Sequence, residues 1–333
     1  MWEPRNAAVV GLMGRARHPE RLLLLALSAL WGVGLAHDGT LITPATLSSA
    51  WNWDPLILFS LIAASLLYAR GLWVLWRRAG VGRGVGRWQA AAFAGGIYTL
   101  FVALVSPLDA LGHALFSAHM AQHMLLALVA APLLVLGAPL LPLLWALPGR
   151  GRRAAGSWWN DSRRVRALCH GLTGPLVVCC LFAVILWVWH LPGLYQAAVE
   201  SALVHALEHA SMLFAAGLFW WLVVQPLGRR RLNYGGAILL VFITSVHSTV
   251  LGALFVFAPT PLYPLYEASV GAWGLTPIAD QRLAGLIMRT PGTFIFLLTI
   301  AVLFLLWLSE MERRASPPRS VRAAPVKPDV LES

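Results

Sequence analysis

Cysteine and charged residues are both scarce in this chain of 333 residues. It has three Cys, and charged residues make up 12% of the sequence, compared with about 25% in typical soluble proteins. Cys179 and Cys180 are adjacent within an apolar run, so no disulfide framework is implied. Hydrophobic residues make up 59% and there are 16 Trp. This composition excludes an ordinary soluble domain and indicates an integral membrane protein.

Acidic residues are the scarcer charged class, with 14 Asp and Glu against 25 Lys and Arg. The net charge of +11 could suggest nucleic acid as a partner. However, the Arg residues form short clusters between apolar runs rather than one basic face, which argues against nucleic-acid binding. They are typical of topology signals instead, because the cytoplasmic loops of membrane proteins are enriched in Arg and Lys. The sequence therefore predicts a lipid bilayer as the chain's surroundings.

Residues 1–36 have the layout of a signal peptide. Arg15, Arg17 and Arg21 precede the uncharged run 22–35, and small residues stand just before His37. The alternative is an extra N-terminal helix that is not cleaved. Cleavage after Ala36 would make His37 the N-terminal residue and give it an amine and an imidazole for metal binding.

Seven apolar runs follow, and each reaches or approaches the roughly 20 residues that span a bilayer. Basic clusters follow the first, third, fifth and seventh runs, so the positive-inside rule places these loops in the cytoplasm. The prediction is an all-α, polytopic membrane helix bundle over residues 37–310, followed by a disordered cytoplasmic tail at 311–333. The runs lie at about 55–76, 89–108, 119–146, 170–190, 205–227, 235–258 and 289–309.

Histidine gathers at the predicted outer ends of these runs. His119 and His123 stand four residues apart at the start of the third run, and His205 and His209 repeat this spacing at the start of the fifth. Residues four apart lie on one helix face, so each pair presents two imidazoles together. If the two helix starts face each other, we expect at least three of the four rings to lie within about 8 Å of one another.

Thioethers and a carboxylate accompany the two pairs. Met120 and Met124 lie beside the first pair, and Glu208 lies beside the second, where it could ligate a metal or orient an imidazole. Imidazole and thioether ligands suit Cu(I) better than Mg²⁺ or Ca²⁺. We therefore predict a Cu(I) site at the outer membrane face. Further candidate ligands are His190, His247, Met288 and Asp280, with His190 and His247 expected farther out or deeper.

Other interpretations of these residues remain open. His205-Ala-Leu-Glu-His209 has the spacing of inverted zinc proteases, but no separate acidic ligand helix is visible and the motif opens a membrane span. Bis-histidine haem ligation is disfavoured, because the two His of a pair are only about 6 Å apart along the helix axis. His190 could be an interfacial residue, His247 could make interhelical hydrogen bonds, and Asp280 could pair with Arg282.

Several segments, in order, make the chain resemble the polytopic CtaG family of cytochrome c oxidase assembly factors, which is distinct from the single-span copper chaperone of the same name. The more specific segments are His119–Met124 and Asp280–Met288, and together the segments cover about residues 50–310. The others are Trp53–Pro55, Ser106–Leu108, Ala131–Leu134, Gly137–Pro139, Trp189–His190 with Pro192 and Tyr195, and His205–His209.

The resemblance implies a multi-span protein of the bacterial cytoplasmic (inner) membrane that is needed for active haem-copper oxidase and is not an enzyme. Copper handling is the role suspected for such proteins. Our leading hypothesis is an assembly factor that binds Cu(I) and passes it to an oxidase subunit, with a periplasmic copper donor as a second partner. The alternatives are a metal-free membrane scaffold for an oxidase subunit and a haem-binding membrane protein.

Overall fold

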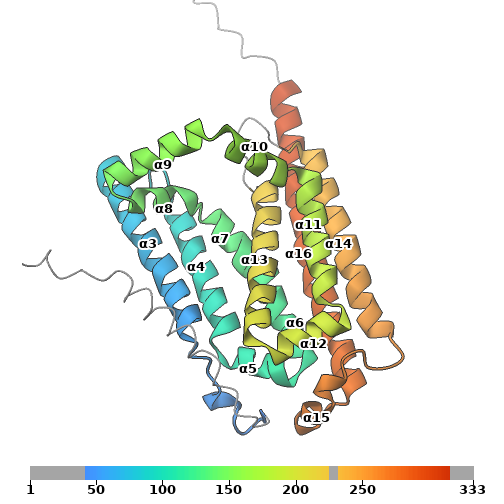
Figure 1. The fold of residues 1–333 in the computed structure, drawn as a ribbon. Coiled ribbons are helices and arrows are strands. Elements are labelled where there is room, and N and C mark those ends of the chain that lie inside the picture. The colour runs from blue at the N-terminus through green and yellow to red at the C-terminus, as the bar shows by residue number, and fades with distance from the viewer. Residues whose placement is uncertain (1–41, 225–231, 316–333) are drawn as a thin grey trace, which may run out of the picture.

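The computed structural model describes residues 42–224 and 232–315 (Figure 1). All regular secondary structure in these two ranges is helical. Five of the helices are long and apolar enough to cross a membrane, and there are seven spans if each of two bent helix pairs counts as one. The protein is therefore an all-α, polytopic membrane helix bundle, as the sequence predicts. The signal-like segment 1–36 and residues 316–333 of the predicted tail lie outside the described residues, whereas residues 311–315, predicted as part of the disordered tail, are the last residues of α16 (Pro277–Ala315).

The main helices of the described residues follow one another along the chain. Proline often occupies the first helical position, where its missing N–H costs nothing, and Asp54 in front of Pro55 also accepts the N–H groups of Leu56 and Ile57. The helices are α3 (Pro55–Ala79), α4 (Arg87–Leu104), α5 (Pro107–Ala114), α6 (Phe116–Met124), α7 (Ala131–Leu136), α8 (Leu140–Ala146), α9 (Gly149–Asp161), α10 (Arg163–Leu172), α11 (Pro175–Trp189), α12 (Pro192–Glu200), α13 (Ala202–Val224), α14 (Tyr234–Phe257), α15 (Glu267–Val270) and α16 (Pro277–Ala315).

The two ends of the bundle differ in character. Figure 1 shows α9 and α10 lying across one end, whereas α5, α12 and α15 lie at the other. The helices α9 and α10 contain six Arg and bury no residue. The sequence predicts this segment only as a basic loop, and the structure shows that it is helical. The histidine pairs begin α6 and α13 at the opposite end from these arginines.

Three predicted boundaries need correction. The third run, predicted at 119–146, ends at Leu136, because the chain turns through Gly137 and Ala138, which has a positive φ of 46°, before α8 begins. The fourth run, predicted at 170–190, is bent by 63° between α10 and α11. The seventh, predicted at 289–309, is the last part of α16, which begins at Pro277. Its polar residues Asp280 and Gln281 are buried rather than in an outer loop.

A π-helical segment, Leu125–Ala130, follows α6 directly and leads into α7. Pro132 has no N–H to donate to the preceding turn, which weakens regular α-helical bonding here. The indole Nε1 of Trp220 donates to the carbonyl oxygen of Ala127 at 2.8 Å, so α13 satisfies a carbonyl within this segment. Such π segments often occur next to functional sites, and this one begins two residues after His123.

The helices α14 and α16 cross closely at two glycines. A Cβ atom on Gly285 would lie 2.6 Å from the carbonyl oxygen of Gly252, so the contact requires the absence of a side chain. Small residues allow helix backbones to approach one another in membranes, where van der Waals packing replaces the hydrophobic effect. This contact holds the start of α16 against the bundle, beside α6.

Candidate metal centre

The two histidine pairs face each other across the interface of α6 and α13. The ring centre of His119 lies 5.4 Å from that of His205 and 5.8 Å from that of His209. The rings of His123 and His209 are 5.2 Å apart. Within the pairs the separations are 4.3 Å and 4.1 Å. The predicted proximity of the two pairs is therefore confirmed.

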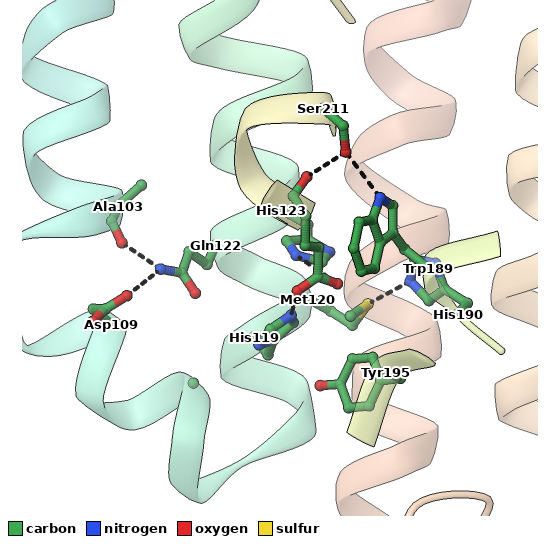
Figure 2. Close-up of polar contacts among 12 residues, drawn as sticks. Ala103, Asp109, His119, Met120, Gln122, His123, Trp189, His190, Tyr195 and Ser211 are labelled. Carbon is green, nitrogen blue, oxygen red and sulfur yellow. Dashed lines mark hydrogen bonds and ion pairs between the residues drawn. The ribbon is translucent and has the colours of Figure 1, made fainter. Parts of the chain in front are cut away.

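The carboxylate of Glu208 lies among these rings and is fully buried. Its Oε2 is 3.5 Å from Nε2 of His119, and its Oε1 is 3.6 Å from Nε2 of His123. Both distances are too long for good hydrogen bonds. Glu208 is held in place through its backbone, because its carbonyl accepts the hydroxyl of Ser211, which in turn accepts the indole N–H of Trp189 (Figure 2).

Several buried polar atoms of this cluster lack a hydrogen-bond partner within the described part of the chain. They include Nε2 of His119, Nε2 of His209 and both carboxylate oxygens of Glu208. Buried polar groups are nearly always hydrogen-bonded, and leaving one unpaired costs about 1–3 kcal/mol. Unpaired nitrogen and oxygen atoms that converge on one buried point have the chemistry of a cation site.

Four residues form a group that could hold a metal ion. One ligand atom from each of His119, His205, Glu208 and His209 lies within 4.8 Å of the others, and all four residues are buried. The group offers three imidazole nitrogens and one carboxylate oxygen. His123 lies outside this group and contacts Glu208 and His209 from one side.

His190 lies closer to the cluster than the sequence suggests. It follows α11 directly, and its ring centre is 6.0 Å from that of His123. Its Nδ1 lies 2.6 Å from the carbonyl oxygen of Leu186, and its Nε2 lies 3.4 Å from Sδ of Met120 (Figure 2). Because a carbonyl oxygen can only accept, Nδ1–H of His190 donates to Leu186, and in the neutral ring the Nε2 lone pair faces the sulfur.

The remaining predicted ligands are farther into the bundle. Met124 and Met288 line a small cavity between α6, α11, α13, α14 and α16. His247 on α14 has its ring 6.1 Å from that of Phe182, which lines the same cavity, and neither of its ring nitrogens has a hydrogen-bond partner in the described chain. The described contacts thus place these three residues at or near this cavity.

Asp280 positions α6 instead of joining the group. Its two carboxylate oxygens accept the backbone N–H groups of Phe116 and Ser117, at 2.7 Å and 3.2 Å. On the other side of α6, the Gln122 amide donates to Asp109 at 2.8 Å and to the carbonyl of Ala103 at 2.7 Å (Figure 2). Two buried polar contacts thus fix the helix that carries His119 and His123.

Sequence reasoning missed several residues around the site. Asp109 has no motif that marks it, and its role depends on contacts with Gln122 and with Asn52, whose Nδ2 donates to it at 2.8 Å. The hydroxyl groups of Tyr195 and Tyr266 are 2.6 Å apart, and burial raises the pKa of both. The His113 ring, 5.1 Å from that of His205, could have been found from its place at a predicted outer helix end.

The fold and the site define a polytopic membrane helix bundle with a buried histidine-glutamate cluster near one end. The family model described as cytochrome c oxidase caa3 assembly factor matches residues 66–310. This match covers most of the chain, so the protein belongs to that family of cytochrome c oxidase assembly factors.

The chain is also similar to uncharacterized mycobacterial proteins. It is 31% identical over 308 residues to Mb0105 of Mycobacterium bovis and to MT0111 of Mycobacterium tuberculosis, an alignment that covers 89% of this chain and 45% of each relative. It is 28% identical over 272 residues to ML1998 of Mycobacterium leprae, covering 80% and 41%. The chain thus spans less than half the length of these relatives. No solved structure matches it.

Proposed function

We propose that the protein binds Cu(I) at the histidine-glutamate cluster and supports the maturation of a copper centre in a haem-copper oxidase. The observation that carries this proposal is the convergence of His119, His205, Glu208 and His209, whose ligand atoms lie within 4.8 Å of one another in a buried space. Ligand atoms of a tetrahedral site with bonds of about 2.0 Å are about 3.3 Å apart. Side-chain rotations that move each ligand atom by about 1 Å would therefore suffice to close the group on an ion.

The charge of the group favours a monovalent ion. Three neutral imidazoles and one carboxylate carry a single negative charge, which Cu(I) neutralises and a divalent ion exceeds. Net charge is costly in a buried site within a membrane bundle. Imidazole nitrogen is also a suitable ligand for copper, whereas Mg²⁺ and Ca²⁺ prefer sites made of oxygen atoms.

The position of the cluster favours exchange of the ion on the outer side of the membrane. The arginine-rich helices α9 and α10 lie at the opposite end of the bundle (Figure 1). If the positive-inside rule holds, that end is cytoplasmic and the cluster is near the periplasmic face of the inner membrane. The protein would then take copper from a periplasmic donor and pass it to an oxidase subunit, acting by binding and transfer rather than by catalysis.

The test is metal analysis of the purified full-length protein in detergent. After loading with Cu(I) and removal of loosely held metal, we expect the wild type to retain copper, and the double variant His205→Ala with His209→Ala to lose the ion bound at the cluster. His170→Ala is the matched control, because His170 is exposed on α10. Copper retention by the double variant equal to that of the wild type would overturn the proposal.

Oxidase activity in cells separates the proposal from a metal-free scaffold. A copper carrier predicts that the double variant still associates with the oxidase subunit but yields inactive oxidase. A scaffold predicts full oxidase activity with the same variant. An absorption spectrum of the purified protein tests the haem alternative in the same preparation, because bound haem has a strong Soret band.

A further inference from the structure

A small cavity lies farther into the bundle than the histidine-glutamate cluster. Its volume is about 30 Å³, and it is bordered by residues of α6, α11, α13, α14 and α16 and of the π segment between α6 and α7. A cavity of this size has room for one water molecule or one ion. Its lining is almost entirely apolar, and Ser248 is the polar residue among the side chains that border it.

Three methionines from three different helices border this cavity. They are Met124 at the end of α6, Met212 on α13 and Met288 on α16. Methionine usually serves in a core as a flexible filler of irregular gaps. Here the three methionine side chains border a cavity that they do not fill. Sulfur is also a ligand that selects soft ions such as Cu(I).

The cavity continues directly from the cluster along two helices. Met212 lies four residues after Glu208 on α13, and Met124 lies five residues after His119 on α6. Each step is a little more than one helical turn, or about 6 to 8 Å along the axis. The soft ligands are thus placed one turn farther into the bundle than the nitrogen and oxygen ligands.

The contact between His190 and Met120 lies near both places, because the His190 ring is 6.0 Å from that of His123 and bonds to Leu186, which borders the cavity. Because Nδ1 of His190 donates to the Leu186 carbonyl, its Nε2 presents a lone pair to Sδ of Met120, 3.4 Å away. Two lone pairs without a proton between them do not form a hydrogen bond, but a soft cation can accept both. With bonds of about 2.0 Å to nitrogen and 2.3 Å to sulfur, a separation of 3.4 Å corresponds to a bent arrangement around one ion.

We propose that the cavity bordered by Met124, Met212 and Met288 is a second metal station, which takes a soft monovalent cation, and that His190 and Met120 pass the ion between it and the histidine-glutamate cluster. The ion is Cu(I), and Ag(I) is its redox-inert analogue. This inference rests on the proposed function for its source of copper. It adds a place where the ion is held by neutral sulfur ligands in an almost entirely apolar space.

The two stations differ in the ions that they accept. The cluster has a carboxylate and three imidazoles, so it can also take Zn²⁺. The cavity has no described acidic residue at its border, so a divalent ion would keep its full charge in an apolar space, which is costly. We therefore expect Ag(I) to occupy both stations and Zn²⁺ to occupy only the cluster.

The experiment uses the full-length protein in detergent and compares two variants. The first replaces Met124, Met212 and Met288 by Leu, which nearly conserves side-chain volume. The second is His205→Ala with His209→Ala. Met311→Leu is the matched control, because Met311 is 53% exposed near the end of α16. Bound Ag(I), Cu(I) and Zn²⁺ are counted for each variant, and X-ray absorption reports whether sulfur lies at about 2.3 Å from the metal.

We expect the wild type to bind two equivalents of Ag(I) or Cu(I) and one of Zn²⁺. The methionine variant should lose one monovalent equivalent and most of the sulfur signal while keeping its Zn²⁺. The single variant Met212→Leu, which changes packing less than the triple variant does, should weaken the same equivalent at least tenfold. Unchanged monovalent stoichiometry and an unchanged sulfur signal in the methionine variant would overturn the second station.

The same data separate this inference from the proposed function. If the wild type binds one monovalent equivalent, and this equivalent is lost in the histidine variant but kept in the methionine variant, the second station is wrong. The cluster is then still supported as the copper site. Loss of an equivalent in the methionine variant, together with no loss in the histidine variant, supports the station and overturns the cluster as a copper site.

Discussion

The carboxylate of Asp280 accepts the backbone N–H of Phe116 at 2.7 Å, although the two residues are 164 positions apart. This bond ties α16 to the first residue of α6. The first N–H groups of a helix have no partner within the helix, and a negative charge is favourable at this end. Asp280 thus holds the helix that presents His119 and His123, from a distance that no local motif could reveal.

Asp280→Ala should destabilise the protein and weaken metal binding together. The change leaves the buried N–H groups of Phe116 and Ser117 without their acceptor, at a cost of about 1–3 kcal/mol for each. Thermal unfolding in detergent measures the first effect, and the affinity for Cu(I) measures the second. Asp161→Ala is the control, because Asp161 is exposed at the end of α9. Wild-type stability of Asp280→Ala would contradict the anchoring role.

Gly285→Ala should separate α14 from α16 and lower the stability of the protein. The new methyl group would lie 2.6 Å from the carbonyl oxygen of Gly252 and 2.8 Å from Cγ2 of Val256, and overpacking of this kind costs about 1–3 kcal/mol. Gly217→Ala on α13 is the matched control, since no atom lies within 4 Å of its added Cβ. That control should be neutral or stabilising, because Ala favours helix over Gly by about 1 kcal/mol.

Tyr195, whose ring lies 5.1 Å from that of His119, and its partner Tyr266 should respond unequally to removal of their hydroxyl groups. Tyr266 donates to the carbonyl of Gly112 at 3.0 Å, so its oxygen accepts the hydroxyl of Tyr195, 2.6 Å away. Tyr195→Phe removes one donor and leaves the Tyr266 bond to Gly112 in place. Tyr266→Phe leaves both a buried donor and a buried carbonyl unpaired, so its loss of unfolding free energy should be larger by about 1–3 kcal/mol. Equal losses would contradict this direction of donation.

The features that could be predicted from the sequence are those set by local periodicity. Apolar runs separated by arginine clusters indicated the helix bundle, because a span needs a minimum length and leaves charge outside the bilayer. The spacing of His119 and His123, and of His205 and His209, placed each pair on one helix face. Both pairs lie at the outer start of a span. They are therefore close together when the two helices that carry them lie side by side.

Features that depend on contacts between distant segments could not be predicted in this way. The start of α16 at Pro277 was missed because Asp280 and Gln281 are polar, and only their bonds to α6 and to the loop before α15 permit their burial. The approach of His190 to Met120 depends on how the end of α11 is placed relative to α6, across 70 positions of sequence. The periodicity of apolar residues shows which face of a helix is buried, but it does not show which other helix packs against that face.

Glu208→Gln should selectively remove the stabilisation that metal gives to the protein. The amide has nearly the same shape as the carboxylate but no charge, so the cluster would keep its packing and lose the group that neutralises Cu(I). Without metal, the variant should be at least as stable as the wild type, because a buried carboxylate without hydrogen bonds is removed. Ligand binding stabilises a folded protein by about 2.7 kcal/mol when the ligand is at a hundredfold excess over its Kd.

We therefore expect a clear rise in Tm on adding Cu(I) to the wild type and a much smaller rise for Glu208→Gln, corresponding to an affinity at least tenfold weaker. Thermal unfolding at several Cu(I) concentrations measures both the metal-free stability and the shift. Glu267→Gln is the matched control, since Glu267 is an exposed carboxylate on α15 at the same end of the molecule. An equal Cu(I)-dependent shift in Glu208→Gln and the wild type would exclude the carboxylate as a ligand. A reduced shift in Glu208→Gln together with a normal shift in Glu267→Gln is the result that the buried cluster requires.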